Sequence, residues 1–423
     1  MIDAKLIRSD PDGVRAALAR RGAGEAVDAF LELDTDRRRL LSEVEQARAE
    51  ANAAAKEIGK VKAQGGDASA AIARQAELKR ALGDEEQQLA AVDARITELL
   101  LATPNLPDET AADGMAEEDS ATLKTYGEKP DFGFEPRDHL ALAGPEGLGL
   151  IDMESAGRVS GSRFHYLLGD LVRLEFALVQ WALDKLVGYG FTPVIPPVLV
   201  REEAMVGTGM FPEARAQVYA LGSDELFLVG TAEVPLASMH QDRIFQPEEL
   251  PLHYVGFSTC FRREAGAAGK DTRGIFRVHQ FDKLEIFVYC QPEESNAEHE
   301  RILAIEEEIA QQLGLHYQVQ NIAVGDLGAP AAKKYDIEVW LPGQERYREL
   351  TSCSNCTDYQ ARRLGIRVKA DKGTRHIHML NGTAVTSSRT LLALIEYGQQ
   401  ADGSIATPEV LHRFGAPALI AAG

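Results

Sequence analysis

A seven-residue repeat between residues 40 and 99 constrains the fold of this chain more than any other feature of its sequence. Apolar or alanine residues recur there at alternating spacings of four and three, which places them along one stripe of an α-helix, as in a coiled coil. The first run is Leu40, Val44, Ala47, Ala51, Ala54, Ile58 and Val61, and the second is Leu78, Leu82, Glu85, Leu89, Val92, Ile96 and Leu99. Gly65 and Gly66 lie between the runs and permit a tight reversal. The sequence therefore predicts a long antiparallel hairpin of two helices.

The charge of this hairpin differs from that of the rest of the chain. With 45 Lys and Arg against 65 Asp and Glu, the net charge of -20 argues against a protein that binds nucleic acid with its whole surface. Residues 37–62, however, hold seven basic and four acidic side chains, whereas residues 68–101 hold four basic and six acidic ones. Two interpretations remain open: a spacer or dimerisation coil with solvated charges, or a first helix that contacts a phosphate backbone.

Beyond the hairpin the sequence predicts a second, mixed domain. The prolines of residues 103–107 and the acidic stretch 108–119 indicate a linker, so we expect domains at 1–103 and 121–423 joined by residues 104–120. Helical patterns at 170–187, 297–313 and 391–397 are mixed with short apolar runs at 191–200, 225–229 and 286–289. Because strands and helices do not alternate regularly, we expect an α+β fold with an antiparallel sheet flanked by helices.

Residues 261–285 form the densest polar cluster, with six basic and four acidic side chains. The pattern predicts a strand, a loop at 265–272 and a return strand whose one face carries Arg277, His279, Phe281, Lys283 and Glu285. Arginine forks bind phosphate oxygens at any working pH, and Phe281 could stack on a base, so a polyphosphate ligand would suit this face. The alternative is a solvated hairpin whose charges neutralise one another.

Three shorter segments give weaker signals. Glu349 and Ser352 offer the hard oxygen ligands that magnesium binds together with phosphate oxygens. The alternative interpretation of the same residues is an exposed strand end. Thr231 and Glu233 follow an apolar run and would share a face at a strand end, or else belong to a helix cap. The pair Cys353 and Cys356 could indicate zinc or redox chemistry, but the absence of a second C-x-x-C favours buried thiols.

The compartment is predicted from the cysteines and the hydropathy. Four cysteines are too few for a disulfide framework, and the sequence shows neither a leader pattern nor an uninterrupted apolar segment long enough to span a membrane. We therefore expect a cytoplasmic protein without a membrane partner.

Along essentially its whole length the sequence resembles the bacterial-type seryl-tRNA synthetase family, which belongs to class II of the aminoacyl-tRNA synthetases. The resemblance rests on GFTPVIPPVLV (190–200) as motif 1, FRREAGAAGKDTRGIFRVHQFDKLE (261–285) as motif 2 and LNGTAVTSSRTLLALIE (380–396) as motif 3. Further matches are VSGSRF (159–164), MVGTGMFP (205–212), GTAEVPL (230–236) and YRELTSCSNCTDYQARR (347–363). Ser388 departs from the family, which usually has glycine before the arginine of motif 3.

This resemblance implies an enzyme that activates L-serine with ATP and transfers it to tRNA(Ser), and to tRNA(Sec) where that tRNA is present. It also implies Mg²⁺ as a cofactor, a homodimer, and a tRNA-binding role for the hairpin. The alternative we keep is a homologue that activates an amino acid for an acceptor other than tRNA.

The resemblance further assigns residues to roles. The implied catalytic residues are Arg262, Glu285 and Arg389. L-serine would be bound by Thr231, Ala232, Glu233, Arg262, Glu285, Asn381 and Thr383. ATP would be bound by Arg262, Arg263, Glu264, Arg277, Val278, Phe281, Glu349, Leu350, Thr351, Ser352 and Arg389, and the metal by Glu349 and Ser352.

Overall fold

The computed structural model describes residues 1–265, 271 and 273–421. By its internal contacts the chain divides into two compact units, Ile2–Pro104 and Met1 together with Asn105–Gly423. Of the loop expected at 265–272, residues 266–270 and 272 lie outside the described residues.

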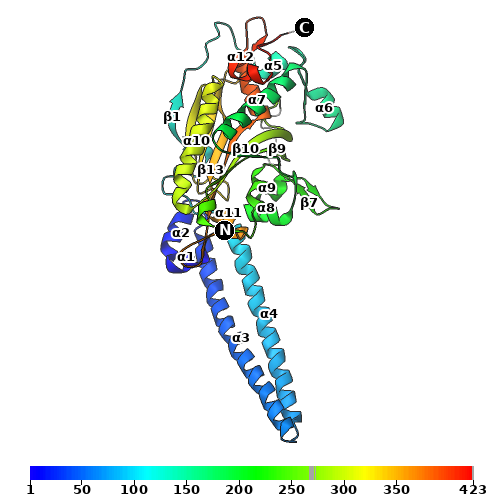
Figure 1. Cartoon of the computed structure of the whole chain (residues 1–423), viewed down its shortest axis with the longest axis vertical. Coiled ribbons are helices and arrows are strands. Elements are labelled where there is room, and N and C mark those ends of the chain that lie inside the picture. Colours follow the sequence, from blue (N-terminus) through cyan, green and yellow to red (C-terminus); the bar gives the residue numbers. More distant parts are fainter. Residues whose placement is uncertain (266–270, 272, 422–423) are drawn as a thin grey trace. The chain divides into compact units, whose positions relative to one another are not determined.

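The first unit is the predicted helical hairpin with two short helices at its base (Figure 1). Its elements are α1 (Ala4–Ser9), α2 (Pro11–Ala19), α3 (Glu25–Ala63) and α4 (Ser69–Ala102). Every residue of the two heptad runs is buried or half-buried, and Gly65 adopts φ +71° in the reversal. At the base, Arg8 pairs with the buried Asp34 of α3 at 2.7 Å. The antiparallel coiled-coil hairpin expected from the sequence is confirmed.

The second unit is built on a mostly antiparallel eight-stranded sheet with the order β1-β11-β12-β13-β16-β10-β9-β4. Its strands are β1 (Ala121–Tyr126), β4 (Thr192–Val194), β9 (Leu252–Phe261), β10 (Gln280–Cys290), β11 (Tyr317–Asn321), β12 (Lys333–Leu341), β13 (Arg346–Asn355) and β16 (His378–Thr386). The two strands expected on either side of the loop are present, because β9 and β10 pair antiparallel from Phe261 and Gln280 onward, although the return strand begins only at Gln280.

Three helices cover one face of the sheet: α7 (Asp170–Gly188), α10 (Ser295–Gln312) and α12 (Ser387–Gly398), of which Figure 1 shows α7 and α10 over the strands. The strand alternation explains this layer. Leu284, Ile286 and Val288 of β10 point into the helix-covered core, whereas Lys283 and Glu285 point to the opposite face. The α+β fold expected from the sequence is thereby confirmed.

Two of the β-bulges in this sheet change the alternation in its central strands, on that opposite face. Leu350 is an extra residue of β13 against β12, and Ala384 is an extra residue of β16 against β10. A bulge inserts one residue, so side chains three positions apart come to share a face. Glu349 and Ser352 therefore face the same side, while the bulged Leu350 is buried in the helix-covered core.

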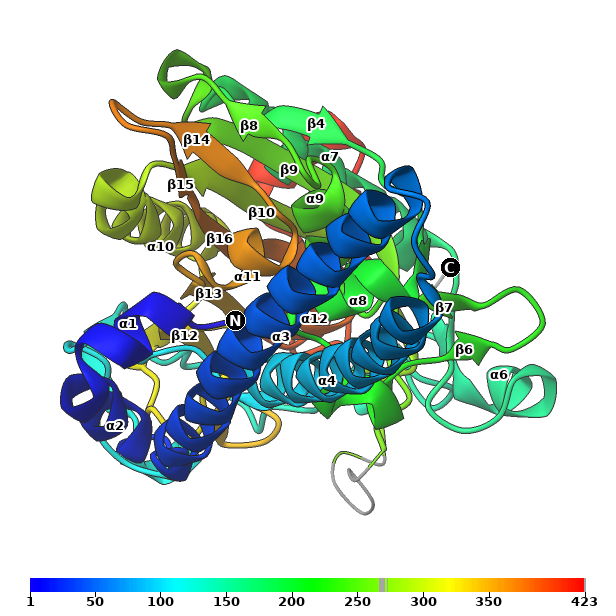
Figure 2. The same ribbon diagram turned by 90° about the horizontal axis from the view of Figure 1, so that it is seen from below.

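The remaining elements complete the second unit. The short helices are α5 (His139–Ala143), α6 (Met153–Val159), α8 (Glu202–Thr208), α9 (Glu233–Ser238) and α11 (Tyr359–Arg363). The small sheets are β5 (Leu199–Arg201) with β6 (Ala220–Leu221) and β7 (Leu226–Leu228); β8 (Ile244–Phe245) with β14 (Arg367–Lys369) and β15 (Thr374–His376), seen side by side in Figure 2; β2 (Ile151–Asp152) with β3 (Tyr166–Leu167); and β17 (Ile405–Ala406) with β18 (Leu419–Ile420). Within the described residues, no helix is both long and apolar enough to cross a membrane.

Candidate active site

Three adjoining cavities lie on the face of the sheet that α7, α10 and α12 leave uncovered. Their volumes are about 570, 80 and 890 Å³, and Glu349 lines all three. The first is an acidic pocket, the second is a narrow passage lined by arginines and Phe281, and the third is a wide charged cleft. We call them the acidic pocket, the passage and the outer cleft.

The acidic pocket brings together most of the residues that the resemblance assigns to serine. Thr231 Oγ1 donates to Glu285 Oε2 at 3.0 Å and accepts the backbone N–H of Glu233 at 3.2 Å. Glu285 also forms an ion pair with the buried Lys283. Asn381 and Thr383 of β16 line the same pocket. The arrangement offers carboxylates and a hydroxyl to a small ligand with an ammonium group.

Glu233 is a buried carboxyl of this pocket whose pKa lies close to neutral pH. Burial, together with the nearby Glu285 carboxylate, raises the pKa of Glu233 to about 7, although Gln360 Nε2 donates to its Oε1 at 2.7 Å. A carboxyl with this pKa is largely charged only above neutral pH.

The predicted strand alternation of Thr231 and Glu233 is wrong. Strand β7 ends at Leu228 and α9 begins at Glu233, so both residues lie at the start of a helix rather than at the end of a strand. The Glu233 N–H donates to Thr231 Oγ1, and Ala232 between them is the N-cap of α9, so both residues belong to the turn that leads into this helix.

The passage holds Arg262 and Arg389. Arg262 Nε donates to the carbonyl of Gly230 at 3.2 Å, and its guanidinium lies 5.4 Å from the centre of the Phe281 ring. Arg389 pairs with Glu349 at 3.2 Å. Burial would raise the pKa of Glu349, but the cations Arg389, Lys334 and Arg262 outweigh burial and lower that pKa to about 2. Glu349 is therefore ionised at any working pH.

The alternation predicted from residue 277 to residue 285 holds only in part. Phe281, Lys283 and Glu285 do line the passage and the acidic pocket. Arg277 and His279 precede β10, which begins at Gln280, so strand geometry does not govern them. Arg277 still reaches the passage, where its Nη1 donates to Glu264 Oε2 at 2.7 Å, and this carboxylate helps to raise the pKa of Arg277 despite burial.

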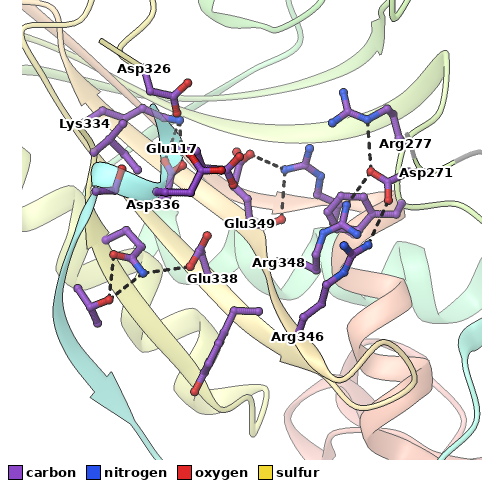
Figure 3. Close-up of a pocket in the computed structure, with 18 residues that line it drawn as sticks. Glu117, Asp271, Arg277, Asp326, Lys334, Asp336, Glu338, Arg346, Arg348 and Glu349 are labelled. Carbon is purple, nitrogen blue, oxygen red and sulfur yellow. Dashed lines mark hydrogen bonds and ion pairs between the residues drawn. The ribbon is translucent and has the colours of Figure 1, made fainter. Parts of the chain in front are cut away.

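Figure 3 shows how the outer cleft is divided by charge. Asp271 lies among Arg277, Arg346 and Arg348, with its closest contact to Arg348 Nη2 at 2.7 Å. Burial would raise the pKa of Asp271, but Arg348 and Arg277 outweigh burial and lower that pKa. Lys334 and Asp336 of β12 pair at 2.9 Å on the other side of the cleft.

The structure does not bring every predicted residue into these cavities. Arg263 is exposed and is not among the described residues that line them. Ala232 is fully buried and packs in an apolar cluster with Leu236. Val278, Leu350 and Thr351 line the passage. All four cysteines are free and buried.

Several lining residues of the outer cleft were not predicted from the sequence: Lys334, Asp336 and Arg348. The alternation of Lys334 and Asp336 with Tyr335 and Ile337 gave a signal for a half-polar strand. No pattern in the sequence indicated Arg348, because the position of its side chain depends on an ion pair with Asp271, which is far away in the sequence.

A mostly antiparallel sheet with a charged, open face agrees with the fold of a class II aminoacyl-tRNA synthetase, and the family models show that the chain belongs to this class. The family model of the tRNA synthetase class II core domain (G, H, P, S and T) matches residues 218–397, and that of the seryl-tRNA synthetase N-terminal domain matches residues 1–107. A serine–tRNA ligase of Streptomyces coelicolor is 48% identical over 419 residues, covering 98% of this chain and 97% of its own, and that of Nocardia farcinica is 47% identical with 98% of each chain covered. The crystal structure of seryl-tRNA synthetase from Pyrococcus horikoshii complexed with ATP matches with a TM-score of 0.92 at 41% identity over 100% of both chains. The chain belongs to the seryl-tRNA synthetase family, so the expected enzyme class, an aminoacyl-tRNA ligase, is confirmed.

Proposed function

We propose that this chain activates L-serine with ATP, releasing pyrophosphate, and transfers the seryl group to the 3′-hydroxyl of the terminal adenosine of tRNA(Ser), and of tRNA(Sec) where present. One observation carries the proposal: an acidic pocket suited to an ammonium group adjoins an arginine-lined passage suited to a polyphosphate, and Arg262 lines both. The serine–tRNA ligases that resemble the chain over 98% of its length support the same reaction.

The proposed serine site is the acidic pocket. Thr231, Glu233 and Glu285 would take the ammonium and the side chain of serine, and Asn381 and Thr383 would lie near its hydroxyl. Ala232 would contribute backbone only, since its side chain is buried. A pocket built to hydrogen-bond a hydroxyl leaves its own polar groups unpaired when alanine enters, which can give a discrimination of about 10⁴-fold or more.

The proposed ATP site is the passage and the adjoining part of the outer cleft. Arg262 would hold the α-phosphate and the serine carboxylate, and Phe281 and Arg389 would enclose the adenine. Glu264 would contact the adenine or the acceptor end of tRNA. The other proposed contacts are Arg263, Arg277, Val278, Glu349, Leu350, Thr351 and Ser352.

No protein nucleophile is needed for this chemistry. The serine carboxylate attacks the α-phosphorus in line, pyrophosphate leaves, and the seryl-adenylate remains bound. Arg262 would stabilise the charge that develops on the phosphate oxygens, while the acidic pocket fixes the direction of the attack.

Glu349 and Ser352 are the proposed ligands of Mg²⁺. The bulge at Leu350 turns both side chains to one face, and the low pKa of Glu349 keeps its carboxylate charged. The described residues contain no cluster of three His, Cys, Asp or Glu side chains suited to a metal, so phosphate oxygens and water would complete the shell. Mg²⁺, when bound, supplies positive charge that neutralises the phosphate oxygens.

We also propose the domain roles implied by the resemblance: a tRNA-binding domain at 1–103, a linker at 104–120 and a catalytic domain at 121–423. A homodimer is supported by exposed apolar side chains in and next to the motif 1 region, where Phe176 is 67% and Ile195 is 85% exposed. The free cysteines support the cytoplasm as the compartment. Activation for an acceptor other than tRNA is not favoured, because residues 1–107 match the N-terminal domain of seryl-tRNA synthetases and the relatives are serine–tRNA ligases.

The test is serine-dependent exchange between ATP and labelled pyrophosphate. We expect exchange with serine, and Arg262→Ala should reduce it by at least about 10²-fold, because one preorganised charge on the phosphate is removed. The circular dichroism spectrum should not change, since Arg262 is half-exposed. Exchange with glycine or alanine but not serine would refute the substrate assignment.

A further inference from the structure

The central strands β13 and β16 separate where the proposed serine site begins. They pair only through Cys353, Ser354 and Asn355 with Gly382, Asn381 and Leu380. Past this point each strand contains a bulge, at Leu350 and at Ala384. Thr351 and Thr383, the residues next to the bulges, therefore lie across a gap in the sheet and have no pairing with each other.

A side chain from the helix layer closes this gap. Glu306 of α10 is 1% exposed, its Oε1 accepts the backbone N–H of Thr383 at 2.8 Å, and its Oε2 accepts from Thr351 Oγ1 at 3.3 Å. A single carboxyl group thus bridges two strands that no longer bond to each other. Without it, a buried backbone donor would lose its partner, which is costly.

The protonation state of Glu306 suits this role. Burial raises the pKa of Glu306 well above its ordinary value, and the carboxylates of Asp336 on β12 and Glu285 on β10 raise it further. The N–H of Thr383 and the hydroxyl of Thr351 oppose the increase without cancelling it. A raised pKa favours the protonated acid, whose shape and hydrogen-bonding capacity a glutamine amide resembles, so an amide could replace it.

Close packing of α10 on β16 brings the carboxyl within reach. At Gly382, a Cβ atom would lie 2.4 Å from Ile302 Cγ2 and 2.8 Å from Glu306 Oε1, distances that no real side chain tolerates. The glycine therefore allows the helix to approach the strand where the sheet opens.

We propose that Glu306 is a positioning residue that sets the separation of β13 and β16 and thereby holds Thr383 in the serine pocket. The inference rests on the proposed serine activation at this site. Glu306 does not line any of the three cavities within the described part of the chain, so its effect passes through the two threonines.

The experiment compares Glu306→Gln with Glu306→Leu in serine-dependent ATP–pyrophosphate exchange. The glutamine variant keeps an acceptor for the Thr383 N–H, so its KM for serine should stay within about twofold of the parent value. The leucine variant leaves that N–H unpaired, and the KM for serine should rise about tenfold while the KM for ATP changes less than about twofold. Thr351→Val, which removes only the second hydrogen bond, should give a smaller increase in the KM for serine.

Glu307, the next residue of α10, provides the matched control. Its carboxylate accepts from the Tyr317 hydroxyl at 3.0 Å and pairs with Lys124, away from the cavities. Glu307→Leu should leave both KM values unchanged. A merely structural role for Glu306 predicts that the KM for serine and the KM for ATP rise equally in the leucine variant, or that the glutamine variant loses its activity. Either result would overturn the proposal. An unchanged serine KM in Glu306→Leu would also overturn it, whereas absence of exchange in the parent enzyme would instead refute the proposed function.

Discussion

The carboxyl of Glu233 changes its charge close to neutral pH, and this gives a prediction for the binding of serine. Its raised pKa of about 7 means that the carboxyl becomes neutral as the pH falls below 7. The attraction for the serine ammonium is then lost, so kcat/KM for serine should fall about tenfold for each pH unit below 7. Steady-state exchange rates between pH 5.5 and 8.5 measure this profile.

Glu233→Gln provides the comparison for this profile. The amide does not titrate, so the variant should have a lower kcat/KM for serine at pH 8 and a flatter profile below pH 7. The KM for ATP should show no matching change, because Glu233 lines the acidic pocket and not the passage. A variant with the same pH profile as the parent would assign the titration to another group.

Single residues differ in how far the sequence could predict their place. The alternation of Phe281, Lys283 and Glu285 follows from the geometry of any regular strand, and it was confirmed. The shared face of Glu349 and Ser352 depends on a bulge, which the local sequence does not announce. Glu306 was not identified, because its role depends on the register between α10 and two distant strands.

Among the elements, the two long helices were the most predictable. A heptad repeat is a local pattern, and it specifies both the helix and the face that packs. The short segment 230–233 was predicted less well, since the change from β7 to α9 takes place within a few residues. Short elements carry little periodicity, so tertiary packing decides them.

The hairpin gives a prediction for tRNA. Lys56, Lys60 and Lys62 near the end of α3 are exposed, and none of them forms an ion pair within the described part of the chain. Arg37 and Arg48, in contrast, are engaged with Asp93 and Glu86 of α4. Substituting the three lysines by glutamine should weaken tRNA(Ser) charging. It should also reduce the slope of the logarithm of tRNA affinity against the logarithm of salt concentration by about one unit for each phosphate that is no longer bound.

The matched readout is ATP–pyrophosphate exchange, which should be unaffected because it needs no tRNA. Lys79→Gln with Arg80→Gln on α4 serves as the control for a change of exposed charge on the other helix. If the variant with all three lysines replaced charges tRNA at the parent rate over a range of salt concentrations, the alternative from the sequence, a spacer role for the hairpin, is favoured instead.

For the molecule as a whole, the sequence predicted the class of the fold but not the order of its strands. Neighbours such as β13 and β16, or β1 and β11, are brought together by contacts between distant segments, and no local pattern encodes them. The gap between β13 and β16, on which the site depends, is a property of that order and of two bulges together.

The stability of the second unit should depend on the charge of Glu175. This residue of α7 lines a cavity of about 390 Å³ together with Asp282 and His165. Burial and then Asp282 raise the pKa of Glu175 from 4.5 to about 7, whereas burial lowers the pKa of His165 to about 4. A carboxyl whose folded-state pKa is raised stabilises the fold fully below pH 4.5, and this contribution is lost as the pH rises to 7.

Glu175→Gln removes the titration of Glu175 and leaves that of His165. The unfolding free energy of the variant, relative to the parent, should therefore increase between pH 4.5 and pH 7, by about 1.4 kcal/mol for each pH unit and about 3 kcal/mol in all. Urea unfolding monitored by circular dichroism at several pH values measures this difference. Glu154→Gln, at an exposed position on α6, should show no such trend. If the difference in unfolding free energy between Glu175→Gln and the parent does not change with pH, burial does not raise the pKa of Glu175 and the prediction is wrong.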